Sequence, residues 1–170
     1  MAESGCLKDG HFNNLEVENS VIMKKNCISL SASKTLTKND CGIIFLDGSN
    51  SPNGSLSEEA TITLPSPETG LHYKFILNPS LTSQNGSFVI NASGNASFVG
   101  SINCSGILKN SSYVNGGEQN IVFGNGSLPG DFVDLTCYTS NDLSRWHTFG
   151  NTGELTGGNA SGVHFYTPPP

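Results

Sequence analysis

The stretch ATITLPSPETGLHYKFIL, residues 60–77, decides the fold class of this chain. Its first part alternates apolar and hydroxyl side chains, with Ile62 and Leu64 on one face and the intervening threonines on the other. Pro-Glu-Thr-Gly then provides turn chemistry, and apolar residues return at every second position from Leu71 to Leu77. Because such alternation is typical of strands with one buried face, the stretch predicts two strands joined by a turn.

Short strand-like segments of the same kind continue on both sides of this stretch. Asn-Gly, Asn-Gly-Gly and Pro-Gly-Asp lie between them, and all three are turn sequences. Strands spaced in this way predict an all-β protein, a single compact β-sandwich or barrel-like domain, with a short solenoid as a further architecture. The segments are GIIFLDG (42–48), SFVINA (87–92), SFVGSI (97–102), QNIVFG (119–124) and DFVDLTCYT (131–139).

The alternating apolar positions of these segments predict the buried core. A chain of 170 residues is long enough to form one domain with such a core. The predicted core residues are Ile43, Phe45, Ile62, Leu64, Tyr73, Phe75, Phe88, Phe98, Val122 and Leu135.

The two terminal segments lack this pattern, so we predict that the chain has three parts. Residues 1–33 form an extended N-terminal arm, residues 34–157 the β-domain, and residues 158–170 a C-terminal tail that ends in three prolines. Backbone donors and acceptors of a strand-like arm must be paired, so we predict that it anchors the protein by adding a strand to a neighbouring subunit. The alternative is that the arm supplies one more strand to its own domain. The predicted anchoring side chains are Leu15, Val17, Val21, Ile22 and Met23.

The composition excludes several classes of partner. Charged residues make up 13% of the chain, the formal net charge is −6, and no basic cluster is larger than Lys24-Lys25, so we expect no nucleic-acid partner. No apolar stretch approaches the length that crosses a bilayer, so we expect no membrane partner. The first twenty residues lack the apolar segment of a signal peptide, and we expect synthesis in the cytoplasm.

Residues with catalytic or metal-binding chemistry form no recognisable motif. The histidines are scattered, the cysteines are odd in number without a CxxC pair, and no GxSxG sequence occurs. We therefore expect no enzymatic activity, no cofactor and no metal site. The cysteines should be small buried side chains or free thiols, and a disulfide between two of them is the alternative. The residues are His11, His72, His147 and His164, and Cys6, Cys27, Cys41, Cys104 and Cys137.

Eight Asn-x-Ser sites form the most unusual pattern in the chain. Every middle residue is Gly, Ala, Cys or Ser, a restriction that N-glycosylation does not require. Tight turns explain it, because Asn tolerates the left-handed region there. Glycosylation and a polar ligand face are the alternatives. The sites are Asn53, Asn85, Asn91, Asn95, Asn103, Asn110, Asn125 and Asn159.

Three stretches resemble small β-rich virion proteins of tailed phages and large double-stranded DNA viruses. They are SKTLTKNDCGIIFLDG (33–48), residues 60–77 and GDFVDLTCYTSNDLSRWHTFG (130–150). The shared pattern is a Thr-Leu-Thr start before an apolar strand, a Thr-Leu-Pro strand, and a Gly-Asp strand that ends near a tryptophan.

The resemblance implies a structural protein of the virion, of the minor capsid, decoration or fibre-base type. Its implied partners are the major capsid protein, other virion proteins and further copies of itself, which capsid symmetry would make a trimer. The competing interpretation is a carbohydrate-binding or host-recognition fibre module that stacks sugars on Trp146 and Tyr138 beside the Asn/Ser face.

Overall fold

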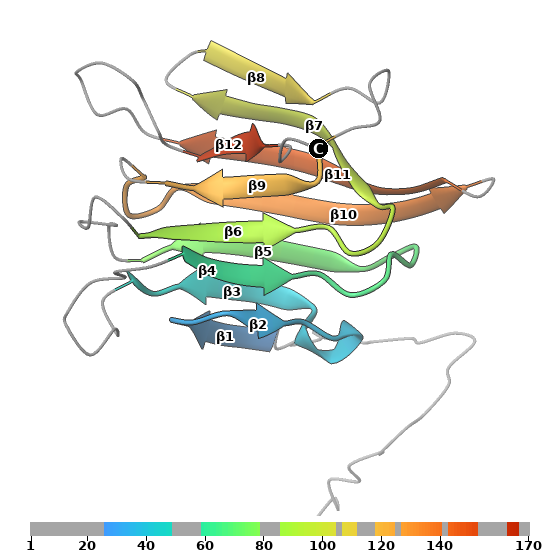
Figure 1. Cartoon of the computed structure of the whole chain (residues 1–170), viewed down its shortest axis with the longest axis horizontal. Coiled ribbons are helices and arrows are strands. Elements are labelled where there is room, and N and C mark those ends of the chain that lie inside the picture. Colours follow the sequence, from blue (N-terminus) through green and yellow to red (C-terminus); the bar gives the residue numbers. More distant parts are fainter. Residues whose placement is uncertain are drawn as a thin grey trace, which may run out of the picture.

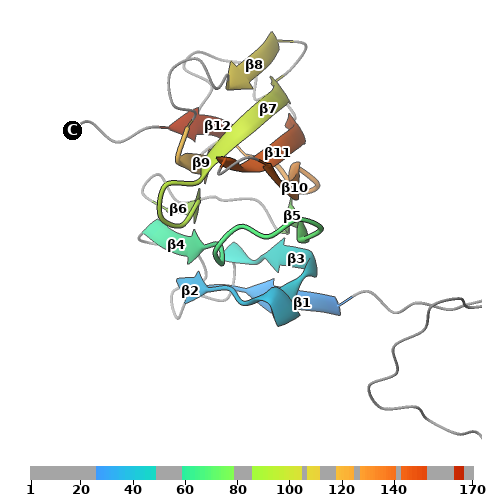
Figure 2. The ribbon, with the colours of Figure 1, turned by 90° about the vertical axis from the view of Figure 1, so that its right-hand side faces the viewer.

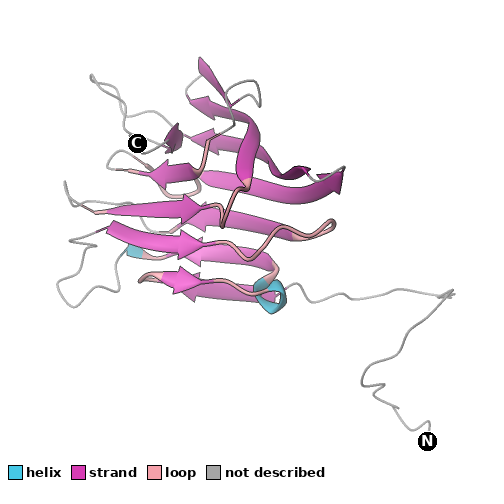
Figure 3. Ribbon diagram, turned by 45° about the vertical axis from the view of Figure 1, so that its right-hand side comes forward, coloured by secondary structure: helices cyan, strands magenta, loops and turns pink. Residues whose placement is uncertain are grey.

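The computed structural model of the chain describes residues 26–48, 59–78, 86–104, 107–111, 118–124, 127–140, 143–152 and 163–166. These residues form twelve strands and one short 3-10 helix, η1, Lys38–Asp40 (Figure 3). The protein is therefore all-β, as its sequence predicts. Within these ranges, no helix is long and apolar enough to cross a membrane.

Two mixed sheets contain the strands and lie face to face (Figure 1). Sheet A has the order β1-β3-β5-β10-β11-β7-β8, and sheet B has the order β12-β9-β6-β4-β2. The strands of sheet A are β1 (Asn26–Leu30), β3 (Gly42–Leu46), β5 (His72–Leu77), β7 (Ser97–Cys104), β8 (Ile107–Ser111), β10 (Phe132–Ser140) and β11 (Leu143–Thr152). Those of sheet B are β2 (Lys34–Thr35), β4 (Glu59–Thr63), β6 (Ser87–Asn91), β9 (Asn120–Phe123) and β12 (Val163–Tyr166).

The first six strands alternate between the two sheets. β1, β3 and β5 pair in parallel in sheet A, while β2, β4 and β6 pair in parallel in sheet B. Each sheet A strand and the sheet B strand after it form one rung, and the three rungs stack on one another (Figure 2). This half of the domain thus follows the path of a short solenoid.

The remaining strands turn this stack into a mixed structure. The hairpin of β10 and β11 lies between β5 and β7 in sheet A. β10 pairs antiparallel with β5, and β11 pairs parallel with β7. In sheet B, β9 pairs antiparallel with β6 and with β12. The backbone N–H of Phe98 in β7 donates to the carbonyl of Glu118 at 2.8 Å, which ties the start of β7 to the segment that enters β9.

Inward side chains from both sheets form one apolar core. Seven of the ten predicted core residues are fully buried, and three predictions are wrong. Ile43, Phe45 and Val122 are only half-buried, because β3 and β9 turn the alternate residues inward. The residues that fill the core in their place are Ile44, Leu46, Ile121 and Phe123. The seven confirmed residues are Ile62, Leu64, Tyr73, Phe75, Phe88, Phe98 and Leu135.

Two glycines allow neighbouring strands to approach closely. Gly42 has φ +139°, and a Cβ atom there would lie 2.4 Å from the carbonyl oxygen of Asn26 in β1. Gly100 has φ +146°, and its Cβ would lie 2.0 Å from the carbonyl oxygen of Thr148 in β11. Any larger residue would push these strand pairs apart.

The sheets extend into both segments that the sequence predicts as termini. β1 lies within the predicted arm and pairs with β3, so the β-domain begins by residue 26 rather than at residue 34. β12 lies within the predicted tail and pairs with β9. For β1, this is the alternative in which the arm supplies one more strand to its own domain. β12 was not predicted, because it is short and pairs with residues distant in sequence.

We predict that Phe75→Ala lowers the free energy of unfolding by about 3–5 kcal/mol, because it removes a fully buried ring from the shared core. Phe45→Ala, on the outer face of the adjacent strand, is the matched control and should cost less than half as much. Chemical denaturation of both variants measures the difference. Equal losses would contradict the observed orientation of β3.

Candidate binding surface

The outer face of sheet A carries apolar side chains that the core does not use. Strand register places Phe45, Ile76 and Phe132 side by side on β3, β5 and β10. Ile43 on β3 and Phe149 on β11 lie at the two ends of the next row, with Lys74 on β5 and Asp134 on β10 between them. We call these five residues the outer apolar band.

The band is accessible at its β10–β11 end. Phe149 is 61% exposed, and its ring centroid lies 6.2 Å from that of Phe132. The ammonium of Lys74 lies 4.5 Å from the centre of the Phe132 ring, at the distance of a cation–π contact. Apolar side chains gathered on one outer face mark an interaction surface more often than chance exposure does.

Polar groups lie both within the band and beside it. The Nε2 atom of His72 and a carboxylate oxygen of Asp134 lie 2.7 Å apart, and both side chains are about one-third exposed. On β10, Tyr138 is 56% exposed. Its ring centroid lies 6.4 Å from that of His147 on β11, in an edge-to-face arrangement. An apolar strip with a polar border is the usual anatomy of a protein-binding surface.

A thiol lies beside this histidine without forming a nucleophilic pair with it. The Sγ atom of Cys41 donates to the backbone carbonyl of His72 at 2.8 Å and accepts from its backbone N–H at 3.1 Å. The imidazole ring of His72 contacts Asp134 instead. An activated cysteine needs the ring nitrogen within hydrogen-bonding reach of the sulfur, so these contacts have a structural role.

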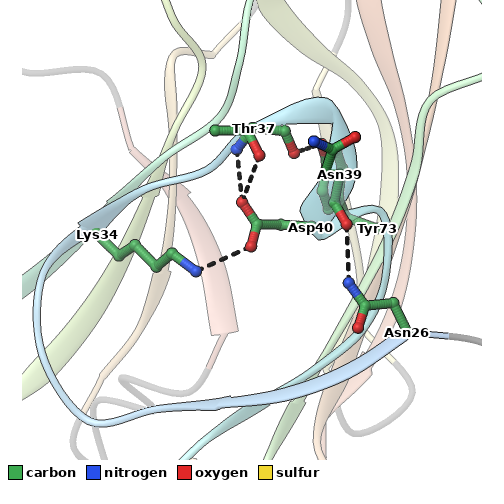
Figure 4. A network of polar contacts seen from close by, with 6 residues as sticks. All are labelled: Asn26, Lys34, Thr37, Asn39, Asp40 and Tyr73. Atoms are coloured by element: carbon green, nitrogen blue, oxygen red, sulfur yellow. Dashed lines mark hydrogen bonds and ion pairs between the residues drawn. The ribbon is translucent and has the colours of Figure 1, made fainter.

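A polar network closes the corner where the first rung ends (Figure 4). Lys34 forms an ion pair of 2.9 Å with Asp40, whose other oxygen accepts from the backbone N–H and the hydroxyl of Thr37. The hydrogen bond from Lys34 is the largest of the effects that lower the pKa of Asp40 below 3.8. The ion pair therefore stabilises the fold above that pH, and its contribution is lost as the pH falls below it.

Two more contacts join this corner to the sheets (Figure 4). The hydroxyl of Tyr73 donates to the carbonyl of Thr37 at 2.8 Å, and the side chain of Asn26 donates to the carbonyl of Asn39 at 2.8 Å. Burial is the main reason that the pKa of Tyr73 rises to about 12. The network holds η1 in place and forms no open site.

The structure separates the two predicted sugar-stacking residues. Tyr138 is exposed on the outer face of β10, but Trp146 is fully buried in the core beside Tyr73, with ring centroids 5.7 Å apart. Trp146 therefore presents no face to a sugar, and that part of the prediction is wrong. Phe132 and Phe149, which also lie on the outer face, were not among the predicted site residues.

The Asn-x-Ser sites do not share one structural role. Asn95 lies in the exposed turn between β6 and β7, as the turn interpretation predicts. Asn91, Asn103 and Asn110 are strand residues, so that interpretation is wrong for them. The side chain of Asn91 donates to that of Asn120 at 2.7 Å across two strands, a use of Asn that turn chemistry does not cover. The sites outside the described residues are Asn53, Asn85, Asn125 and Asn159.

The structure describes some of the predicted cysteines and none of the predicted anchoring residues of the arm. Cys27, Cys41 and Cys137 are free, and burial raises the pKa of Cys137, which keeps it a protonated thiol. Across the described ranges, no group of three or more His, Cys, Asp and Glu residues is arranged to hold a metal ion. The predicted anchoring residues Leu15, Val17, Val21, Ile22 and Met23 all lie outside the described residues.

These features define an all-β domain of two mixed sheets with an exposed aromatic strip on one outer face. Comparison with known proteins finds no matching family model, curated protein or solved structure. Evidence for a function therefore comes from the exposed surfaces of the domain.

The raised pKa of Tyr73 predicts a loss of stability in alkali. The unfolded chain releases this proton near pH 10 and the folded chain near pH 12, so stability is full below pH 10 and falls as the pH rises between the two. Tyr73→Phe should remove this component and cost about 0.5–1.5 kcal/mol at neutral pH through the lost hydrogen bond. Urea unfolding at several pH values tests this, with the exposed Tyr138→Phe as control. An unchanged alkaline slope in Tyr73→Phe would contradict the assignment.

Proposed function

We propose that the chain is a structural protein of a virion, a minor capsid or decoration protein that binds and stabilises the capsid lattice through the outer apolar band. The observation that carries the binding role is the band itself, five apolar side chains on the sheet face opposite to the core. The virion assignment is supported by the resemblance of residues 33–48, 60–77 and 130–150 to small β-rich virion proteins. The implied partner is the major capsid protein.

The physical basis of this attachment is burial of aromatic surface. One aromatic side chain buries roughly 150–250 Å² at an interface, and apolar area contributes about 25 cal/mol per Å² removed from water. Phe149 has most of its ring available for such contact. Lys74 and Asp134 within the band and His72 beside it would fix the orientation of the partner through polar contacts rather than supply most of the affinity.

We also infer that the two sheets form a sandwich rather than a closed barrel. Each sheet ends in two edge strands: β1 and β8 in sheet A, and β12 and β2 in sheet B. A sandwich of this kind leaves the whole outer face of sheet A flat enough to lie on a lattice of other subunits.

A second candidate function is carbohydrate binding at the other end of the same face. Tyr138 is the observation that favours it, since its ring is exposed and is held edge-on by His147. A sugar stacked on Tyr138 would lie beside the hydroxyl of Thr136, which also points outward. Because this candidate uses Tyr138 and the first uses Phe149, single substitutions separate the two.

We predict that Phe149→Asp abolishes co-sedimentation with capsids that lack the protein, because it places a charge at the most exposed aromatic side chain of the band. Asn95→Asp introduces the same carboxylate in the exposed turn between β6 and β7, outside the band, and should bind as the original chain does. Both variants should keep the original thermal unfolding midpoint. Capsid binding that survives Phe149→Asp would contradict attachment through the band.

Two further measurements decide between the candidate functions. Mass spectrometry of purified virions should find the chain at a stoichiometric copy number, and its absence would overturn the virion assignment. On a glycan array, we expect no sugar-dependent binding. Binding that Tyr138→Ala removes and Phe149→Asp leaves intact would support the carbohydrate module instead.

A further inference from the structure

Strand β1 is an open edge of sheet A. It pairs with β3 on one side, and no described strand pairs with it on the other. The backbone N–H of Asp47, in the segment after β3, donates to the carbonyl of Leu30, so Leu30 directs its backbone groups toward β3. Because these groups alternate along a strand, Cys27 and Ser29 direct theirs away from the sheet. Both residues are exposed.

The strand β1 itself contains none of the residues that usually protect a sheet edge. The edge strands β2 and β8 each contain a lysine, Lys34 and Lys109, whereas the nearest charges to β1 are Lys24 and Lys25, before its first residue. The sequence of β1, NCISL, contains no charged residue and no proline. Natural proteins usually block exposed edges with charge, proline or a covering segment, so an unblocked edge indicates a strand that accepts a partner.

The core is also incompletely covered at this edge. The side chain of Ile28 packs against the core but is only half-buried, while its neighbour Ile44 in the next rung is fully buried. The Lys34–Asp40 ion pair lies at the corner of the same rung and puts charge where a further complete rung would stack. This end of the domain thus suits a single added strand better than a second stack of rungs.

We propose that residues 14–23 of a second copy of this chain, NLEVENSVIM, add to β1 as a further strand of sheet A. Leu15, Val17, Val21 and Met23 share one face of such a strand, with Asn19 between the two apolar pairs, so either pair could cover Ile28. A ten-residue segment spans about 33 Å when extended, which is enough to pair along all of β1. The bonds at Cys27 and Ser29 supply affinity, and the alternating side chains set the register.

When the segment pairs along its whole length to Met23, the donor is a neighbouring chain, because the connection within one chain is too short. Met23 is followed by only Lys24 and Lys25 before β1 begins at Asn26. A two-residue hairpin turn needs residues that adopt positive φ, such as Asn-Gly, and Lys-Lys does not provide them. Parallel pairing would need a crossover of a dozen or more residues, so exchange between copies is the arrangement that satisfies both the segment and the edge.

This inference does not depend on capsid attachment. It concerns β1 and residues 14–23, whereas the proposed function concerns the outer apolar band, and either can fail alone. Phe149→Asp should therefore leave the oligomer intact while it removes capsid binding.

Sedimentation velocity of the full chain tests the exchange. We expect an oligomer at micromolar concentration, and Ser29→Pro should convert it to a monomer because proline removes the outward donor at position 29. Ser29→Ala keeps the donor and should remain oligomeric. A monomeric original chain, an oligomeric Ser29→Pro variant, or equal dissociation by Ser29→Ala would each overturn the proposal.

A second pair of variants keeps the test decisive if Ser29→Pro fails to fold. Val17→Gln removes an apolar side chain from the face that would cover Ile28, and it should weaken self-association about tenfold or more. Glu18→Gln changes the opposite face of the segment and should leave self-association nearly unchanged. Equal effects of the two substitutions would contradict strand addition in this orientation.

Discussion

The fold depends on two facing rows of apolar side chains that run across the sheets. In sheet A, Ile28, Ile44 and Phe75 lie side by side in parallel register, and the row continues through the antiparallel strand β10. In sheet B, Ile62 and Ile90 are paired in the same way, and Ile121 extends that row. A slip of one residue in any strand would turn its apolar set outward, so these rows fix the register of every rung at once.

The sequence predicted the existence of most strands but not their assembly. Alternation between apolar and polar residues identified β4 and β5 together with the faces that they bury. In GIIFL and NIVF the apolar residues occupy both alternate positions, so the pattern could not show which face is inward. Pairing between β10 and β5, or between β11 and β7, depends on contacts distant in sequence, and no local propensity encodes them.

The candidate surface was less ambiguous than these strands. In the segment FVDL, Val133 shares its face with the predicted core residue Leu135, and Phe132 shares its face with Asp134, so the alternation already indicated that Phe132 faces outward. Trp146 could have been placed correctly, because Arg145 and His147 on either side of it are polar and alternate with it. Phe149 alternates along β11 in step with the polar residues Arg145 and His147. This pattern indicated that Phe149 lies on the exposed face.

The first rung combines a closed core with an open backbone edge, and these are separate physical problems. Charged side chains from η1 and β2 exclude further apolar stacking, because burial of Lys34 and Asp40 under another rung would remove their remaining hydration. The same side chains do nothing for the outward N–H and C=O groups of β1, which water satisfies only while the edge stays exposed. A strand that pairs with this edge satisfies those groups and covers Ile28 without disturbing the ion pair. The polar corner therefore limits growth of the stack itself to one added strand. Because each copy has one donor segment and one acceptor edge, the assembly is finite where the exchange closes on itself, as between two copies that exchange reciprocally.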